Sequence, residues 1–380
     1  MKLKTCKSLF LIAFTPLLMT AINAHAKAHQ SQFSYQYSLY AEDALATNKV
    51  FSGNNDAYEI TTHLLDMHLP LNETTEGQII LTQETRSGPI PLYVVPDVTL
   101  KQVMSDASIE DKRTDITLNF NRKSEKSEST LSLGYATEDY YQSFSGGVSS
   151  KFHLSSWFSL QLGVNYSQDY IDTLEHEIFI DRQVDESKKR LGAFLGFSYA
   201  LGQTTMVGFT SNYSVVDGYL SDPYKSAWVA NVVVEDARPD SIQQVSNNLQ
   251  IRQYIPSLNA AVHFDYRYFI SDWLFENSNT INLAWHQNFG NGWMLIPSFR
   301  FYDQPAAYFY SPYYNVARND GYNSSDYRLS AFDATSAQLK LTKKFTNFTL
   351  SIAHEIYEAK GKHPGLVNYS FSNVSLTKTF

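Results

Sequence analysis

Apolar and polar residues alternate along most of this 380-residue chain. Residues 33–39, for example, read Phe-Ser-Tyr-Gln-Tyr-Ser-Leu. A period of two places apolar side chains on one face of a β-strand and polar ones on the other. The pattern predicts about sixteen strands of membrane-spanning length. They cover residues 33–39, 57–69, 78–84, 116–120, 131–135, 144–152, 160–166, 191–199, 207–213, 245–251, 262–268, 281–285, 293–301, 329–341, 348–356 and 365–380.

The connections between these strands alternate between short and long. Residues 70–73 and 290–292 are short turns, whereas 87–111, 171–189 and 216–243 are long. This rhythm is typical of a single antiparallel up-and-down transmembrane β-barrel with short periplasmic turns and long outer loops. A soluble β-sandwich also alternates, but its two faces would be core and water.

Aromatic residues favour the barrel over the sandwich. The chain holds 26 Tyr, 24 Phe and 5 Trp, yet its mean hydropathy is negative. After residue 26 no apolar run is long enough for a membrane helix. Large aromatics recur where strands meet turns, as in an interfacial belt; they are Trp157, Phe158, Trp285, Phe289 and Trp293.

The first 26 residues have the features of a cleaved secretory signal. Residues 1–7 carry three lysines, residues 8–22 are mainly apolar, and Ala24-His25-Ala26 fits a cleavage site. We therefore expect residues 27–380 to form the barrel. Cys6 is the only cysteine, so the expected mature chain has no disulfide. Without the signal lysines the formal charge goes from −8 to −11, which argues against nucleic acid as a partner.

The last residues alternate as a strand and end on Phe380. This ending resembles the closing strand of bacterial outer-membrane barrels, in which the barrel assembly machinery reads a terminal aromatic. The resemblance implies that Phe380 is an assembly signal and that this machinery is a partner. Lys378 departs from the pattern, although its ammonium can reach water at a membrane interface.

Several internal segments resemble the signature segments of a bacterial family of predicted outer-membrane barrel proteins classed as a domain of unknown function. The resemblance spans most of the expected mature chain. It implies the barrel fold, the outer membrane of a Gram-negative bacterium as the location, and membrane lipid as a partner. It implies no activity. The segments are 105–109, 134–140, 221–225, 265–268, 285–287 and 325–332.

If apolar positions face lipid, the intervening polar positions face the lumen. This predicts a polar lumen cluster of both charge signs, in which Asp265 accepts a hydrogen bond from a guanidinium. The cluster would either stiffen the barrel as a structural network or form a binding or conduction site, and structural networks mimic sites. Its predicted members are Arg252, His263, Asp265, Arg267, His286, Arg300, Tyr302, Gln304 and Arg328.

Catalytic and metal-binding motifs are absent from the sequence. There is no Gly-x-Ser-x-Gly, His-Glu-x-x-His or phosphate-binding loop, so no catalytic residue, cofactor or metal is predicted. Residues 308–310 and 313–314 would either stack on a sugar or peptide, or fold a loop onto the rim. We expect a non-enzymatic passage or binding scaffold for a small polar solute or exported partner. The alternative is a barrel enzyme acting on lipid or lipopolysaccharide.

Overall fold

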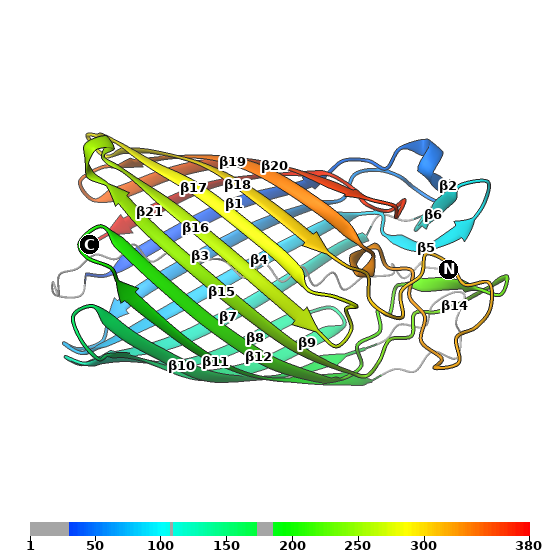
Figure 1. Ribbon diagram of the computed structural model, residues 1–380, viewed down its shortest axis with the longest axis horizontal. Coiled ribbons are helices and arrows are strands. Elements are labelled where there is room, and N and C mark those ends of the chain that lie inside the picture. The colour runs from blue at the N-terminus through cyan, green and yellow to red at the C-terminus, as the bar shows by residue number, and fades with distance from the viewer. Residues whose placement is uncertain (1–29, 107–108, 173–184) are drawn as a thin grey trace.

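Sixteen strands close into one antiparallel barrel (Figure 1). The computed structural model describes residues 30–106, 109–172 and 185–380; the expected signal segment lies outside them. Each barrel strand pairs with the next, and β1 pairs with β21 to close the sheet. The barrel strands are β1 (Gln32–Glu42), β3 (Glu59–Pro70), β4 (Thr75–Gly88), β7 (Ile109–Lys123), β8 (Ser127–Glu138), β9 (Tyr141–His153), β10 (Phe158–Ile171), β11 (Glu186–Ala200), β12 (Thr205–Gly218), β15 (Ser241–Ile255), β16 (Ala260–Ser271), β17 (Ser278–Gly290), β18 (Trp293–Gln304), β19 (Phe332–Lys344), β20 (Phe348–Gly361) and β21 (Tyr369–Thr379).

The predicted fold class and strand number are confirmed, and the alternation has the expected cause. In β11 the side chains of Leu191, Leu195 and Phe197 are exposed on the outer face, whereas Gly192 and Gly196 on the other parity are buried. Removing apolar surface from water stabilises a protein by roughly 25 cal/mol per Å². An outer face of apolar side chains is therefore unfavourable in water and favourable in contact with the hydrocarbon of a membrane. Among the described residues, no helix has the length and apolar character needed to cross a membrane.

One end of the barrel, here called the turn end, carries the short connections. The first residue of β1 and the last residue of β21 also lie at this end, paired with each other. The turn at 290–292 shows why glycine is needed in so tight a reversal, because Gly290, Asn291 and Gly292 all have positive φ. A Cβ on Gly292 would lie 2.2 Å from the Lys344 carbonyl oxygen, so only glycine fits there.

Three of the five large aromatics predicted near the turns are exposed at the turn end, as a membrane interface would need, whereas Phe158 and Trp285 are half-buried. Trp157, Phe289 and Trp293 all lie on the surface there. The ammonium of Lys378 lies 4.6 Å from the centre of the Phe380 ring. The basic residue that departs from the closing-strand pattern therefore contacts the terminal aromatic instead of disrupting the strand.

The opposite end, here called the loop end, has its own small structures. A three-stranded sheet joins β2 (Val50–Ser52), β5 (Pro91–Pro96) and β6 (Leu100–Met104), and β13 (Ser226–Val229) pairs with β14 (Val232–Glu235). Both lie beyond the right-hand rim of the barrel in Figure 1. Three short 3-10 helices complete the fold: η1 (Thr47–Lys49) and η3 (Tyr327–Leu329) at this end, and η2 (Pro256–Leu258) at a turn.

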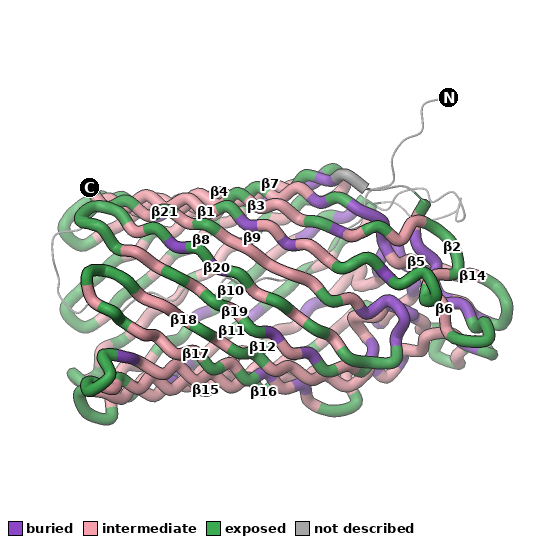
Figure 2. The backbone as a smooth tube through the Cα atoms, turned by 90° about the horizontal axis from the view of Figure 1, so that it is seen from above, coloured by how far each residue is buried: buried purple, intermediate pink, exposed green. Residues whose placement is uncertain are grey.

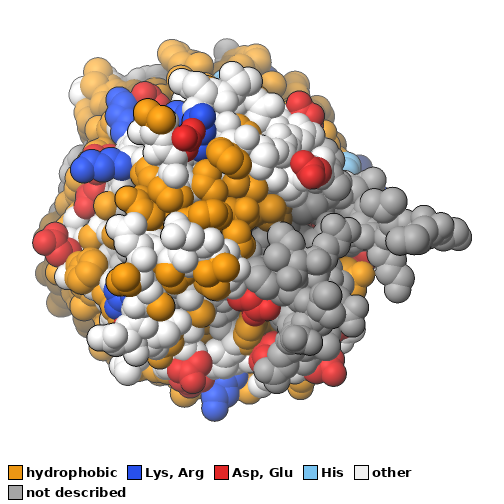
Figure 3. Space-filling model, turned by 90° about the vertical axis from the view of Figure 1, so that its right-hand side faces the viewer, with side chains coloured by type: hydrophobic (Ala, Val, Ile, Leu, Met, Phe, Trp, Pro, Cys, Tyr) orange, Lys and Arg blue, Asp and Glu red, His pale blue; other side chains and the backbone are white. Residues whose placement is uncertain are grey.

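The loops fold inward over the mouth of the barrel. Tyr224 and Ile90 come from two long loops and form a buried cluster with the lumen-facing Tyr40, and Tyr327 packs against it. Buried residues are concentrated at this end in Figure 2, and apolar side chains gather near the centre of the face seen in Figure 3. The buried apolar clusters of the described chain therefore lie at the loop end.

Two predicted strands begin four or three residues too early: β21 begins at Tyr369 and not at 365, and β19 begins at Phe332 and not at 329. The alternation predicted a strand from residue 329, but β19 begins at Phe332 and residues 327–329 form η3. Asp326 caps η3 by accepting a hydrogen bond from the Arg328 backbone at 3.1 Å. This local contact competes with strand pairing, because a short Asp side chain readily binds nearby backbone N–H groups.

Candidate functional site

Eight of the nine predicted lumen residues lie on the lumen-facing parity of their strands. In β16 the exposed Tyr268 and Ile270 share the outer parity, which leaves His263, Asp265 and Arg267 on the inner one. Residues directly opposite each other on paired strands point to the same face, so the register assigns the other residues to the lumen face as well. The opposite pairs are Arg252 with His263, Ala261 with His286, Asn282 with Arg300, Thr280 with Tyr302, and Phe332 with Gln304.

The guanidinium partner expected for Asp265 is Arg252. Arg252 Nη2 donates to Asp265 Oδ1 at 2.6 Å, while Nη1 donates to the carbonyl oxygens of Ile251 and Phe264 at 3.0 Å. Both charged side chains are less than a fifth exposed. The pair is therefore anchored to the wall at mid-strand, as a structural contact would be.

The two lumen histidines meet face to face. The ring centres of His263 and His286 are 3.9 Å apart, with 33° between their planes. Sequence reasoning gave no basis for this contact, because it depends on the pairing of β16 with β17. No group of three His, Cys, Asp or Glu suited to a metal occurs among the described residues.

Arg267 and Arg300 are the exposed cations of this wall. Arg267 Nε donates to the Ser246 hydroxyl at 3.0 Å, and Arg300 Nε donates to Asn282 Oδ1 at 2.9 Å. Within the described residues, the terminal nitrogens of both guanidiniums have no hydrogen-bond partner. Both side chains are exposed although they face the interior of a closed barrel. The lumen beside them is therefore not filled by protein side chains.

Small residues line another part of the lumen, along β8 to β11. They leave a cavity of about 320 Å³ against this wall. Its lumen-facing lining is Thr117, Ser132, Gly134, Ser145, Gly147, Ser149, Asn165, Ser167, Arg190 and Phe194. The lumen is thus asymmetric, with small residues on one side and the Arg267 wall with its large side chains on another.

Arg328 does not belong to the lumen wall, which corrects the prediction. It lies in η3 within the loops, because the strand assigned to it begins four residues later. Gln304, at the end of β18, is the connection between the two regions. Its side-chain amide donates to the carbonyl oxygens of Arg328 and Ser330 at 2.9 and 2.7 Å, and it accepts from the Tyr302 hydroxyl at 2.6 Å.

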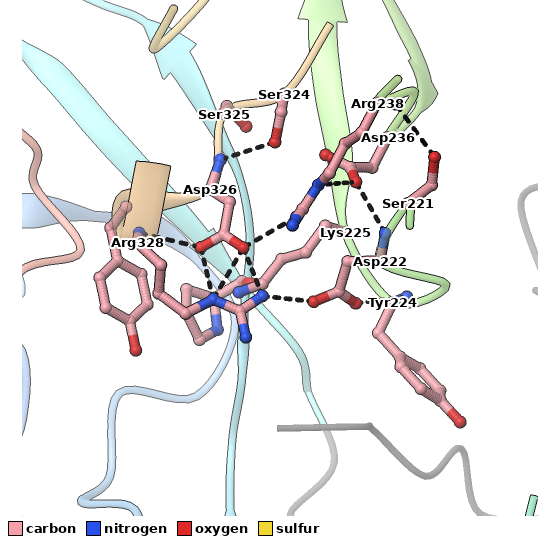
Figure 4. A network of polar contacts seen from close by, with 12 residues as sticks. Ser221, Asp222, Tyr224, Lys225, Asp236, Arg238, Ser324, Ser325, Asp326 and Arg328 are labelled. Atoms are coloured by element: carbon pink, nitrogen blue, oxygen red, sulfur yellow. Dashed lines mark hydrogen bonds and ion pairs between the residues drawn. The ribbon is translucent and has the colours of Figure 1, made fainter. Parts of the chain in front are cut away.

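Arg328 instead joins a buried network here called the loop cluster (Figure 4). Asp326 accepts hydrogen bonds from Arg328 and from Arg238 Nη2, the latter at 2.9 Å. Arg238 Nε also donates to Asp236 at 2.6 Å, and Arg328 also donates to Asp222. Burial would raise the pKa of Asp326, but the cations of Arg328, Lys225 and Arg238 hold it well below its usual value.

Two further residues extend the loop cluster to four loops. Lys225 is buried and donates to the Pro91 carbonyl oxygen; its burial lowers its pKa to about 8 despite the charge of Asp326. His363 Nδ1 accepts from the Gly365 N–H at 2.9 Å, so Nε2 must carry the proton that reaches the Ser325 carbonyl oxygen at 2.8 Å. Burial lowers the pKa of His363 to about 4.

Sequence reasoning missed the loop cluster and a second charged group on the barrel wall. In the wall group, Arg86 Nη1 of β4 lies 3.4 Å from Glu138 of β8 and 3.8 Å from Asp111 of β7. Arg113 adds a contact of 3.8 Å to Glu138. These partners are far apart in sequence. The available signal for the loop cluster was that two of the family-like segments, 221–225 and 325–332, contain its charged residues.

Two of the aromatic loop residues, Phe309 and Tyr314, have a structural role. Phe309 is completely buried against Trp273 and Ala307, and Tyr314 donates from its hydroxyl to the Phe309 carbonyl oxygen at 2.6 Å. Residues 308–314 therefore form the core of their own loop. Their burial removes Phe309 and Tyr314 from any ligand surface.

The outer face carries a Ser–His pair. His354 Nδ1 lies 2.9 Å from the Ser372 hydroxyl, on the parity that also exposes Ile352 and Ile356. Among the described residues no carboxylate is hydrogen-bonded to His354. The third group that orients the base in a hydrolytic triad is therefore missing there.

The closed sheet, the apolar outer face and the polar lumen together define a β-barrel of the outer-membrane type. The family comparison is more specific: the chain belongs to the family described as "Protein of unknown function (DUF3570)", whose model matches residues 2–373. No curated protein matches the chain.

Solved structures agree on the fold. A bacterial polysaccharide outer membrane secretin superposes with a TM-score of 0.52 and 9% identity, over 93% of this chain and 99% of that one. OpdO from Pseudomonas aeruginosa superposes with a TM-score of 0.45 and 8% identity, over 94% of this chain and 98% of that one. The siderophore receptor PirA from Acinetobacter baumannii superposes with a TM-score of 0.47 and 8% identity, over 88% of this chain and 53% of that one. At such identities the similarity shows the fold alone, and the statement about the fold uses only the secretin, the first of these three structures.

Proposed function

We propose that the protein is a non-enzymatic passage for small polar solutes in the outer membrane of a Gram-negative bacterium. The observation that carries the proposal is the solvent exposure of Arg190, Arg267 and Arg300 inside a closed barrel. A lumen plugged by a structural ion network would bury its charges in pairs. Charged side chains that remain wet inside a sheet instead line an aqueous route, and they set which ions use it.

The loop end would restrict this route. The loop cluster ties four loops together over the mouth, and the apolar cluster around Tyr40 fixes them to the wall. Solutes would pass only where these loops leave space or move apart. The proposal therefore includes low conductance in the resting protein and higher conductance when the loop cluster is weakened.

Barrel assembly machinery and membrane lipid are the partners that this proposal requires. Phe380 donates its backbone N–H to the Ser31 carbonyl oxygen at 2.9 Å, so it lies beside the start of the first strand. That position suits a residue read during closure of the seam. Fractionation of cells that express the chain with its first 26 residues tests location, and recovery in the soluble periplasm would refute it.

The decisive test of function is ion conductance of the purified protein in a planar bilayer. We expect discrete steps of current that vanish when the protein is omitted or heat-unfolded. A barrel that inserts and shows its heat-modifiable band, yet carries no current in either the wild type or a loop-cluster variant, would refute passage.

A second candidate is a lipid-acting enzyme that uses Ser372 and His354. The contact between Ser372 and His354 on the outer face favours the enzyme. The position of the two residues along the membrane normal argues against it. His354 lies six residues beyond Phe348, hence about 15 Å above the turn end of a tilted strand. That height is near the middle of a hydrocarbon layer of about 30 Å, far from lipid ester groups. Phospholipid hydrolysis lost in Ser372→Ala would support the enzyme, and equal background rates would exclude this pair.

A further inference from the structure

Arg267 and Arg300 differ from the other arginines whose contacts define the wall and loop networks. Arg86, Arg113 and Arg252 each lie within 4 Å of a carboxylate, and so do Arg238 and Arg328 in the loops. Among the described residues, Arg267 and Arg300 have no such partner. Both are held through Nε by neutral side chains, which leaves their Nη pairs directed away from the anchoring atoms.

The two guanidiniums are close enough for their charges to repel each other. They flank β17: Arg267 is opposite Thr280, and Arg300 is opposite Asn282 on the other side of the same strand. Asp265 lies across Asn282 from Arg300, but its carboxylate is bound by Arg252, and Glu355 on the same wall accepts from the Gln338 amide. A bound anion would relieve the repulsion between the two cations. A guanidinium with a free pair of Nη donors matches the geometry of a carboxylate or phosphate.

A row of side chains beside Arg300 adds an aromatic surface. Arg300 is opposite Ser336, Ser336 is opposite Tyr357, and Tyr357 is opposite Tyr369, all on the lumen parity. The rings of Tyr357 and Tyr369 are stacked at 4.2 Å with 16° between planes. Ser336 is small and buried between its larger neighbours. The stacked pair therefore lies on the same wall, two strands from Arg300 across the small Ser336 and four strands from Arg267.

The wall on the other side of the lumen carries the opposite charge. In the closed sheet, β4 lies eight strands from β16, and β8 lies eight strands from β18. Glu84 on β4 and Glu138 on β8 are lumen-facing, at the positions opposite Thr62 and Tyr141. Arg86 and Arg113 lie among these carboxylates, but with Asp111 and Asp115 the acids outnumber them. An anion in the lumen would therefore be favoured on the side of Arg267 and Arg300.

We propose that Arg267, Arg300 and the Tyr357–Tyr369 pair form a binding site for small organic anions, namely carboxylates attached to a ring. The guanidiniums bind the carboxylate, and the ring lies against the tyrosines. The proposal rests on the proposed function, since it names the class of solute that the passage admits.

The test uses benzoate as the probe, with acetate and inorganic phosphate as comparison anions. Benzoate should reduce chloride current through the wild type at concentrations at least severalfold lower than acetate. The double variant Arg267→Gln, Arg300→Gln should weaken the benzoate block at least tenfold. Tyr357→Ala should remove the preference for benzoate over acetate and leave the acetate block within about twofold. Phosphate blocking better than benzoate would overturn the ring requirement.

Arg190→Gln is the matched control, because Arg190 is an exposed lumen arginine on β11, outside the Arg267 wall. It removes one lumen charge away from the proposed site, so it should leave the ratio of benzoate block to acetate block unchanged. An equal loss in this control and in the double variant would show a general field effect and overturn the site. If the wild type carries no current, passage fails, and calorimetric titration of benzoate into the detergent-solubilised barrel decides the site separately. Equal heats for wild type and double variant would then refute it.

Discussion

Replacing Asp326 with Asn should open the loop end while the barrel stays folded. Asp326 is buried, and its carboxylate accepts from both Arg238 and Arg328. Asn has nearly the same size and keeps one acceptor oxygen, so the substitution removes the charge and little volume. The backbone ladder of the sixteen strands does not involve this side chain, and the closed sheet should therefore survive.

The expected loss can be estimated from the partners that remain. Removing one member of a buried ion pair costs roughly 3–5 kcal/mol, because the other charge stays buried. Here Arg238 keeps Asp236 at 2.6 Å and Arg328 keeps Asp222. The loss of stabilising free energy should lie at the lower end of this range, about 3 kcal/mol. It should destabilise the closed arrangement of the loops and not the barrel. A change of that size raises the population of opened loops by about a hundredfold.

Hydrogen exchange read by mass spectrometry and single-channel conductance together test this reasoning. Residues 219–240 and 305–331 should exchange faster in Asp326→Asn, and conductance should rise. Asp320→Asn is the matched control in the same loop, since Asp320 binds Arg318 at 2.6 Å with both side chains about one third exposed. Surface pairs contribute about 0–1 kcal/mol, so the control should behave like the wild type. Wild-type exchange in Asp326→Asn would refute the role of the loop cluster.

Three further outcomes are expected. Deleting Phe380 should lower the amount of assembled barrel far more than Phe348→Ala, which removes one lipid-facing contact of roughly 1.5–3 kcal/mol; equal amounts would contradict a closing role. Asp265→Ala should destabilise the barrel to heat by about 3 kcal/mol, because Arg252 loses its carboxylate; an unchanged melting temperature with a shifted reversal potential would assign the pair to the solute route. Acidification from pH 6.5 to 4 should loosen residues 361–368 by up to about 3 kcal/mol, because the unfolded His363 binds a proton near 6.5 and the folded one only near 4; the effect should vanish in His363→Gln, and its persistence there would exclude this histidine as the cause.

The barrel could be predicted from sequence because each strand repeats one simple physical requirement. A lipid-facing side chain must be apolar at every second position, and the sheet must close, since unpaired backbone groups are costly in hydrocarbon. The segment at 33–39 carries that signal alone, and β1 extends it to Gln32–Glu42. The lumen parity of His263, Asp265 and Arg267 follows from the same alternation.

The loop end could not be predicted, because its contacts are long-range. Asp326 meets Arg238 across 88 positions, and Arg328 meets Asp222 across 106. No period links these residues. The strand predicted from residue 329 failed for a related reason: the alternation continues into η3, but the Asp326 side chain binds the backbone there and the buried cluster holds that geometry.

Burial and pairing separate structural charges from functional ones in this molecule. A charge in a protein interior must be paired with an opposite charge. Arg238 and Arg328 meet this condition, since each contacts more than one carboxylate. Arg267 and Arg300 meet no such condition, yet they are ordered by neutral partners on rigid strands. Ordering a flexible cation without a counter-ion costs side-chain entropy. A neutral residue at the same position would stabilise the folded barrel at least as well. This placement is the observation behind our proposal that a solute supplies negative charge beside them.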